Sequence, residues 1–359
     1  MTAFKLKSMN MRMATDEDAH LPAFDHTKLS AINTCPTWGI LRYTHHKRMP
    51  STYRQMALEA GTASHEGFSA VRLFQHLFHS NMNGVKLEAN VLLHGTRLFG
   101  RERLSQMMAT LSKDATERTN CINFVIEAVE TCGFYDDIGD RNRTLSNICE
   151  SLIAYIDAYN MERYPIWIRD VNDPNTDIGI EIPFDIVVDI NWTDPFEHRL
   201  ATRFTGKLDG LHWNKEKLII IEEKTGARLD DAWLAQWILS HQITGYCLAS
   251  TTFTGLPCNE ALVSGMRLPI GRIPAEGIRK EFVPRYPIMY EKWANWFVDT
   301  IATNEKYKDD VLDAPMHTTS CNRYFSSCSF MPLCAAPDIE EKERILDDME
   351  LDEWSPLHG

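Results

Sequence analysis

The sequence predicts a mixed α/β fold in which helices flank a central mixed β-sheet. Two β-rich runs, Arg203–Trp213 and Lys217–Lys224, flank the polar residues Asn214-Lys215-Glu216 and indicate a hairpin. Long stretches with helical periodicity precede and follow this hairpin. The composition, 44% hydrophobic and 24% charged over 359 residues, is typical of a globular protein with a sizeable core. This length allows two domains or one elaborated domain.

Composition and pattern divide the chain into five segments. These are an N-terminal arm at residues 1–27, a helical region at 28–164, a sheet-containing core at 165–310, a cysteine-rich loop at 311–336 and an acidic tail at 337–359. The arm is polar and rich in methionine, without a clear period, so we expect an ordered arm at most.

The helical region begins with two short helices. Ser30 can cap the first, and Pro36 can open the second at its first turn. Residues 56–78 predict one long helix that Gly61 and Gly67 weaken. From Asn83 to Tyr164 the pattern is helical throughout. This stretch is the richest source of positive charge, with Arg97, Arg101, Arg103, Arg118, Arg141, Arg143 and Arg163.

The core alternates strands and helices. Ile178–Ile190 predicts a strand, with Pro183 near an edge or bulge. After the hairpin, Asp230–Ser250 predicts a single helix with acidic residues in its first turn, which the helix dipole favours. Further strands are expected at Ala261–Arg267 and Ile278–Pro284. A tryptophan-rich helix at residues 288–307 is expected to cover the other face of the sheet.

Charged residues occur where the hairpin strands end. Leu218–Ile221 is apolar on both faces, which predicts a buried central strand, and it leads directly into Glu222-Glu223-Lys224. Because side chains alternate along a strand, Glu222 and Lys224 face one side and Glu223 the other. If pairing puts Asp209 on the first side, two oxygen ligands and an ammonium meet where Mg²⁺ or Mn²⁺ can bind. The alternative is a surface hairpin with ordinary charges.

Four short motifs follow one another along the chain. G-x-x-D at Gly206–Asp209 precedes the hydrophobic run that ends E-x-K-T-G at Glu222–Gly226. G-x-x-x-H lies upstream at Gly61–His65, and Q-x-x-x-Y lies downstream at Gln242–Tyr246. Together they resemble the PD-(D/E)xK nucleases, in their RecB/AddB-type exonuclease branch, and four motifs in the expected order are far more specific than any one of them. The resemblance implies a restriction-endonuclease-like core with an N-terminal helical insertion.

The resemblance also implies a metal-dependent deoxyribonuclease. His65, Asp209 and Glu222, with the main-chain carbonyl of Ile221, would hold Mg²⁺ or Mn²⁺. Lys224 would orient the attacking water and offset charge on the scissile phosphate. The expected products carry 5′-phosphates.

Three more residues receive roles from the same resemblance. Gln242 and Tyr246, four residues apart on one helix face, would contact substrate or metal-bound water; the alternative is a hydrogen-bonded pair at the core edge. Glu181 is a secondary candidate for metal or water binding. The helical insertion would roof the active site and line a DNA channel, although a helical cap with solvated arginines is equally compatible.

Three cysteines near the C-terminus, Cys321, Cys328 and Cys334, have the spacing C-x6-C-x5-C. Three ligands do not complete a tetrahedral site, and Cys35 near the N-terminus is the natural fourth donor. This split resembles the iron-sulfur clasp of RecB-type nucleases, although the first step of the trio is longer here. The resemblance favours a 4Fe-4S cluster that joins the chain ends, with Zn²⁺ or free thiols as alternatives. The remaining cysteines show no ligand spacing and are expected to be buried thiols: Cys121, Cys132, Cys149, Cys247 and Cys258.

The net charge of −13 argues against a general electrostatic attraction to nucleic acid, so DNA requires a local basic groove. Arg42 and the run His45–Arg48 form either a basic face for phosphates or a plain solvated face. The tail 338–353 is strongly acidic and is expected to contain an exposed helix, with a DNA-mimicking or partner-binding role as a minor alternative. No signal peptide or membrane-length apolar run is present, which predicts an intracellular, cytoplasmic protein that does not contact membranes.

The sequence therefore predicts an exonuclease that acts on single-stranded or duplex DNA ends in recombination, replication or repair. Because the chain contains no P-loop motif, a helicase or recombination protein would be a separate partner. A virus or mobile element is a plausible origin. Two alternatives stay open: a CRISPR-type nuclease that trims spacers or single strands, and a DNA-end-binding scaffold subunit without catalysis.

Overall fold

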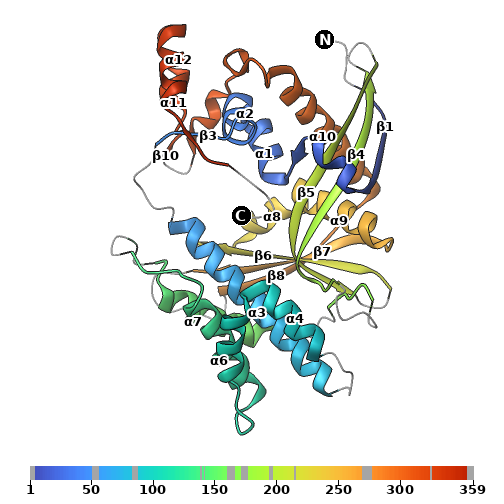
Figure 1. Ribbon diagram of the computed structural model, residues 1–359, viewed down its shortest axis with the longest axis vertical. Helices are drawn as coiled ribbons and strands as arrows, with labels where there is room; N and C mark the ends of the chain where they lie inside the picture. The colour runs from blue at the N-terminus through green and yellow to red at the C-terminus, as the bar shows by residue number, and fades with distance from the viewer. Residues whose placement is uncertain are drawn as a thin grey trace. The chain divides into compact units, whose positions relative to one another are not determined.

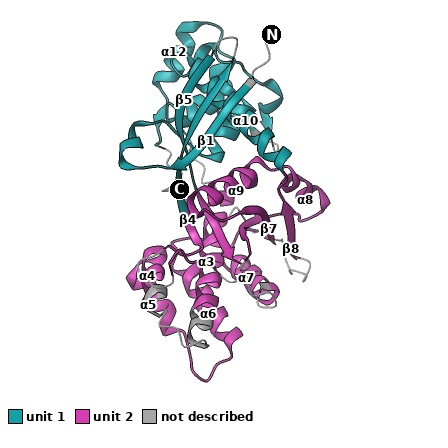
Figure 2. Cartoon of the chain, turned by 90° about the vertical axis from the view of Figure 1, so that its right-hand side faces the viewer, with its two compact units in different colours: residues 1–53, 183–206, 287–359 teal, residues 54–182, 207–286 magenta. Residues whose placement is uncertain are grey.

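The computed structural model describes residues 5–50, 56–82, 88–137, 140, 142–159, 166–170, 177–193, 197–213, 216–268, 277–323 and 326–353. The chain forms two compact units, each assembled from separated segments (Figure 2). Unit 1 comprises residues 1–53, 183–206 and 287–359, and unit 2 comprises residues 54–182 and 207–286. The expected polar turn at 214–215 lies outside the described residues.

Unit 1 combines strands with three packed helices. Strand β1 (Lys5–Met13) pairs antiparallel with β4 (Ile180–Thr193), and β2 (Ala23–Phe24) pairs parallel with β5 (Glu197–Trp213). Helices α1 (His26–Thr34), α2 (Pro36–Tyr43) and α10 (Pro287–Tyr307) contact one another. Phe204 of β5 packs against Trp293 and Phe297 of α10, with ring centroids 5.3 Å and 5.8 Å away. The tryptophan-rich helix predicted at 288–307 is thus present, and in this unit it packs on α1, α2 and β1.

The N-terminal segment is more regular than predicted. Nine of its residues form β1, which is followed by the 3₁₀ helix η1 (Asp16–His20). Along β1 the side chains of Leu6, Met9 and Met11 are half-buried and alternate with exposed ones, but a register shift between Leu6 and Ser8 interrupts the period. This bulge and the absence of β-branched residues explain why the sequence pattern does not reveal the strand.

The C-terminal part of unit 1 packs on α2. It contains η3 (Val311–Asp313), η4 (Thr318–Ser320), β9 (Asn322–Arg323), β10 (Ser326–Ser327), α11 (Met331–Cys334), α12 (Ile339–Asp347) and β11 (Glu350–Leu351). Leu41 of α2 is buried with Phe330, Leu333 and Met349 in one small core. The predicted exposed helix in the acidic tail is confirmed as α12, in which no residue is fully buried.

The basic stretch before residue 50 is neutralised by the acidic tail. Strand β3 (Lys47–Arg48) pairs antiparallel with β11. Arg42 contacts Asp352 at 2.8 Å, and Arg48 contacts Glu350 at 2.9 Å. Two guanidinium groups of this stretch thus pair with carboxylates of the acidic tail, and a role of the stretch in phosphate binding stays a prediction.

Unit 2 contains a mixed sheet covered by helices on both faces, as predicted (Figures 1 and 2). The second half of β5 pairs antiparallel with β6 (Leu218–Gly226), β6 pairs parallel with β7 (Cys258–Arg267), and β7 pairs antiparallel with β8 (Ile278–Pro284). Helices α8 (Asp231–Ile238) and α9 (His241–Thr254) cover one face. Helices α3 (Met56–Met82) and α7 (Leu145–Tyr159) cover the other.

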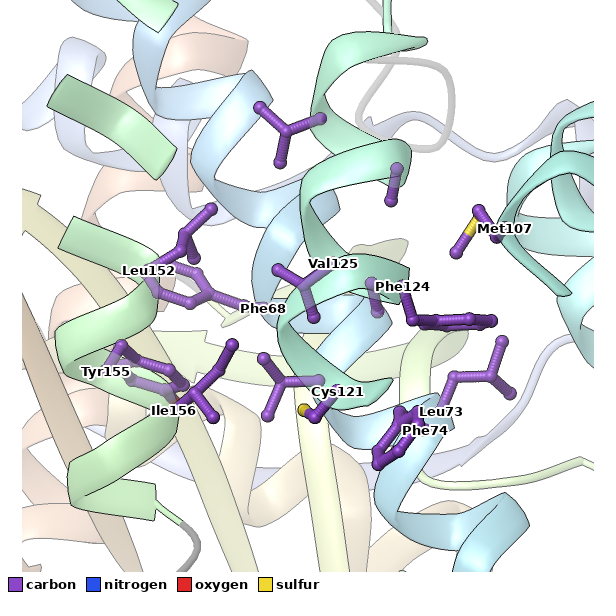
Figure 3. Packing of buried hydrophobic residues seen from close by; sticks show 14 of the residues in the cluster. Phe68, Leu73, Phe74, Met107, Cys121, Phe124, Val125, Leu152, Tyr155 and Ile156 are labelled. Carbon is purple, nitrogen blue, oxygen red and sulfur yellow. The ribbon is translucent and has the colours of Figure 1, made fainter. Parts of the chain in front are cut away.

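A helical cluster forms the main core of unit 2 (Figure 3). Helices α4 (Glu88–Phe99), α5 (Arg101–Ala109) and α6 (Glu117–Glu130) join α3 and α7 there. The ring centroid of Phe124 lies 5.7 Å from that of Phe74, and the ring centroid of Phe68 lies 4.7 Å from that of Tyr155. Neither glycine of α3 breaks the helix: a Cβ at Gly67 would come within 2.4 Å of Leu152 Cδ1, so this glycine permits close helix packing.

The single helix predicted at 230–250 is in fact two helices. Asp230 caps α8 by accepting the Trp233 N–H, and Ser240 caps α9 by accepting the Ile243 N–H. A second N-cap residue starts a new helix, so the chain bends at Leu239, a residue that is 72% exposed.

Several strand boundaries also differ from prediction. Strand β4 extends to Thr193, three residues beyond the expected end, because β1 supplies pairing partners there. Strand β6 continues through Thr225-Gly226, beyond the expected end at Lys224, because β7 pairs with both residues. Among the described residues, no helix combines the length and apolar character that crossing a membrane requires.

Candidate metal centre

Three candidate metal ligands converge in unit 2 from three separate elements. One atom each of His65 on α3, Glu181 on β4 and Asp209 on β5 lies within 4.8 Å of the other two. His65 Nδ1 is 3.5 Å from Asp209 Oδ1. Two carboxylates and an imidazole nitrogen are donors that suit Mn²⁺ or Mg²⁺. The expected approach of His65 to Asp209 is therefore present, and Glu181, the secondary candidate, is the third member of the group.

Asp209 lies where β5 and β6 stop pairing. Gly210 and Ile221 form the last residue pair described between these strands, and Asp209 Oδ2 accepts the N–H of Glu223 at 2.7 Å. Burial opposes ionisation of Asp209, but the neighbouring His65 and Lys224, with the Glu223 N–H, lower its pKa overall. Asp209 is therefore held as a carboxylate beside the histidine.

Glu222 and Lys224 form a second part of the centre, on one face of β6 as alternation predicts. Lys224 Nζ lies 2.5 Å from Glu222 Oε1, which also accepts a hydrogen bond from Gln242 Nε2 at 2.8 Å. Gln242 Nε2 also donates to the Tyr246 hydroxyl at 3.2 Å. The Q-x-x-x-Y pair of α9 thus contacts the E-x-K motif directly.

The charges of this pair are set by burial and by each other. Glu222 is fully buried, and burial raises its pKa to about 7 although Lys224 opposes the shift. Burial alone would lower the pKa of Lys224, but Glu222 and Asp209 outweigh it and raise that pKa. Glu222 Oε2 is buried and finds no hydrogen-bond donor among the described residues. Such an orphaned oxygen is available to a ligand from outside the chain.

Glu223 has different partners from its neighbours on β6, as alternation predicts. Its Oε2 accepts a hydrogen bond from Arg72 of α3, and its Oε1 accepts one from the Tyr155 hydroxyl of α7. All three side chains are almost completely buried, with at most 1% of each residue exposed. Burial raises the pKa of Glu223, while Arg72 opposes that shift.

Sequence reasoning missed the residues that hold the carboxylates. Ser69 Oγ donates to Glu181 Oε1 at 2.9 Å, and Lys207 Nζ lies 3.0 Å from Glu181 Oε2. His65, Ser69 and Arg72 are four and three residues apart and so share one helix face. This spacing could have predicted that Ser69 and Arg72 lie near the centre. Nothing local in the sequence points to Tyr155 or Lys207.

Ile221 is the expected ligand with the least geometric support. It lies in register with Gly210 of β5 on one side and Leu262 of β7 on the other. The carbonyl of a central strand at such a position is directed toward a neighbouring strand.

The four predicted cluster cysteines come together in unit 1. Cys35, at the N-cap of α2, lines a cavity of about 330 Å³ with Cys321, Cys328 and Cys334. Burial, together with the neighbouring thiols, raises the pKa of Cys334 to about 11. Trp38, Met316, Phe330 and Met331 also line this cavity. Of the remaining cysteines, Cys121, Cys247 and Cys258 are buried, and Cys132 and Cys149 are half-buried.

Several arginines of the helical region already pair with carboxylates. Arg103 contacts Glu66 at 2.9 Å, and Arg118 contacts Asp157 at 2.5 Å. Arg143 contacts Asp140 at 2.6 Å. Arg97 and Arg101 are exposed, and Arg141 and Arg163 lie outside the described residues.

Comparison with known proteins adds little. No family model matches this chain, and no curated protein matches it. A crystal structure of SSO0001 aligns with 55% of this chain and 80% of its own, at 15% sequence identity and a TM-score of 0.27. A likeness this weak carries no argument about fold or function.

Proposed function

We propose that this protein is a metal-dependent deoxyribonuclease of the PD-(D/E)xK type that hydrolyses phosphodiester bonds at DNA ends. One observation carries the proposal. The carboxylates, lysine and histidine of the motifs come from separate segments of the chain, yet His65 and Asp209 lie 3.5 Å apart, beside the Glu222–Lys224 pair. A surface hairpin with ordinary charges would not bury Glu222 completely.

The donor set fits a hard divalent cation. His65, Asp209 and Glu181 would hold Mg²⁺ or Mn²⁺, and the orphaned Oε2 of Glu222 offers another oxygen. When bound, such an ion would lower the pKa of a water molecule and offset charge on the phosphate.

The protein's own residues would complete the chemistry. Lys224 keeps its proton because neighbouring carboxylates raise its pKa, so its ammonium can donate a hydrogen bond to a phosphate oxygen. Gln242 fixes the orientation of the Glu222 carboxylate. Attack of water on phosphorus, with cleavage of the P–O3′ bond, would leave a 5′-phosphate and a 3′-hydroxyl.

The cysteine cavity fits a metal cluster with four thiolate ligands. Cys35, Cys321, Cys328 and Cys334 would hold a 4Fe-4S cluster, which would cross-link the two ends of the chain. Protein purified without oxygen should then absorb near about 400 nm, through charge transfer from thiolate to iron. Bound Zn²⁺, detected by metal analysis without this absorption, would contradict the iron-sulfur assignment.

Digestion of labelled DNA tests the enzymatic proposal. A linear duplex and a single strand are incubated with Mg²⁺ and either the wild-type protein or Lys224→Ala. We expect the variant to lose about 10²- to 10³-fold in rate, the usual effect of removing a charged donor from a reacting phosphate or carbonyl. Lys217→Ala, which removes a lysine from the start of β6 that pairs with Glu260, should keep the wild-type rate.

Other outcomes would favour the alternatives. Equal rates for Lys224→Ala and wild type would remove Lys224 from the mechanism. If neither the wild type nor a variant cleaves DNA but the wild type still binds DNA ends, the result would favour a scaffold subunit. Cleavage confined to single strands would favour a trimming nuclease. A nuclease of this kind would act inside the cell, together with a separate helicase or recombination protein.

A further inference from the structure

We propose that Arg72 is a positioning residue of the metal centre, because its guanidinium bridges Glu181 of β4 and Glu223 of β6. The inference rests on the proposed function, since it assigns a role in binding the divalent ion. Arg72 belongs to none of the four sequence motifs.

Arg72 contacts both carboxylates from inside the protein. Only 1% of the residue is exposed, its Nη1 donates to Glu223 Oε2, and its Nη2 lies 3.7 Å from Glu181 Oε1. The planar fork of a guanidinium fixes the relative positions of the groups that it contacts, which a lysine ammonium does not. Arg72 therefore links two strands through their side chains.

One of these carboxylates belongs to a candidate metal ligand, Glu181, and the other belongs to a residue that contacts a second candidate ligand, Asp209. Glu181 belongs to the group that includes His65 and Asp209. Glu223 presents its main-chain N–H to Asp209 Oδ2 at 2.7 Å. A change at Arg72 would thus reach two ligands, one directly and one through the backbone of Glu223.

The backbone of Glu181 is also unusual. Its φ of 48° lies in the left-handed region, which residues other than glycine rarely adopt. Such a conformation persists only where the surroundings hold it, and it often marks a functional position. Ser69 donates a hydrogen bond to the Glu181 carboxylate, and Lys207 and Arg72 form ion pairs with it at 3.0 Å and 3.7 Å.

A test must show whether Arg72 only stabilises the fold through its buried ion pair or also positions the metal ligands. Removing one partner of a buried pair strongly destabilises a protein, whereas replacing the whole group by apolar side chains of similar volume is often neutral or stabilising. The triple variant Arg72→Met, Glu223→Met, Tyr155→Phe removes the ion pair and the Tyr155 hydroxyl that would lose its acceptor. It leaves the Glu223 N–H in place.

The experiment measures binding of Mn²⁺ alone by electron paramagnetic resonance, with thermal unfolding in EDTA as the check on folding. We expect the triple variant to unfold at or above the wild-type temperature but to bind Mn²⁺ about 10- to 100-fold more weakly, as is typical when the residues that orient metal ligands are lost. The control Arg118→Met, Asp157→Met removes an exposed pair between α6 and α7 and should keep wild-type affinity.

Wild-type Mn²⁺ affinity in a folded triple variant would overturn the proposal. If that variant fails to fold, Arg72→Lys replaces it in the same assay, because it keeps the charge but loses the fork; wild-type affinity there would equally refute a positioning role. A wild-type protein that does not bind Mn²⁺ would instead refute the proposed function, and this inference with it.

Discussion

Glu222→Gln should make the ion-free protein more stable at pH 8. Glu222 is fully buried, and its carboxyl has a pKa of about 7 instead of its ordinary 4.5. Glutamine has the shape of the protonated acid and cannot ionise. The substitution therefore removes the cost of burying a charge, which the wild-type protein bears above pH 7 when no ion is bound.

The sign and size follow from proton linkage. A carboxyl whose pKa is higher in the folded chain binds its proton more tightly there, so its contribution is complete below pH 4.5 and is lost as the pH rises through about 7. The difference between these values corresponds to about 3 kcal/mol, at roughly 1.4 kcal/mol per pH unit. Burial also raises the pKa of Glu223. The unfolding free energies of both wild type and Glu222→Gln therefore keep a further decrease as the pH rises.

Thermal and denaturant unfolding in EDTA at pH 5 and pH 8 provides the assay. We expect wild type and Glu222→Gln to have similar unfolding free energies at pH 5, and the variant to be more stable by about 3 kcal/mol at pH 8. Glu260→Gln, which removes a carboxylate that pairs with Lys217, is the matched control and should not show this gain. If Glu222→Gln has the same pH dependence as wild type, Glu222 does not titrate as described.

Three further predictions concern the two units. Phe124→Ala, at a fully buried position between α6 and α3, should destabilise unit 2 by about 3–5 kcal/mol in denaturant unfolding; a smaller loss would mean that the helical cluster can collapse around the cavity. Gly265→Ala should cost about 1–3 kcal/mol in the same assay, because its Cβ would come within 2.7 Å of the Trp233 ring; an unchanged value would show that α8 shifts freely. Burial lowers the pKa of Lys28 to about 8 from 10.5, so the charged form costs stability below pH 8. Lys28→Met should raise the unfolding free energy by up to about 3 kcal/mol at pH 7, with a smaller gain at pH 10, and a gain that grows with pH would contradict this sign.

Local patterns in the sequence predicted much of unit 2. The apolar run of β6 indicated a buried central strand, and the alternation after it correctly separated Glu222 and Lys224 from Glu223. The helical periodicity around His65 predicted α3. These features depend on backbone geometry over a few residues, so they can be read from a single sequence.

The ends of helices and strands were harder to predict, because they depend on contacts with other segments of the chain. The long helix predicted across Leu239 ends there because Ser240 caps a new helix, and Arg285 donates to the carbonyls of Trp237 and Ile238 at the bend. Strand β1 was not predicted, because its bulge breaks the alternation of half-buried and exposed side chains. Its residues have low β-propensity, and pairing with β4 stabilises the strand instead.

The sequence by itself placed Glu222 and Lys224 on one face of their strand, because side chains alternate, and the resemblance of its motifs predicted that His65 and Asp209 lie beside them. Only the tertiary structure decided how they are grouped: Glu181 joins His65 and Asp209, Glu222 pairs with Lys224, and Arg72 links Glu181 to Glu223. Side-chain periodicity is a local property of the backbone. Contacts between distant segments depend on how whole helices and strands pack, and no local pattern encodes that packing.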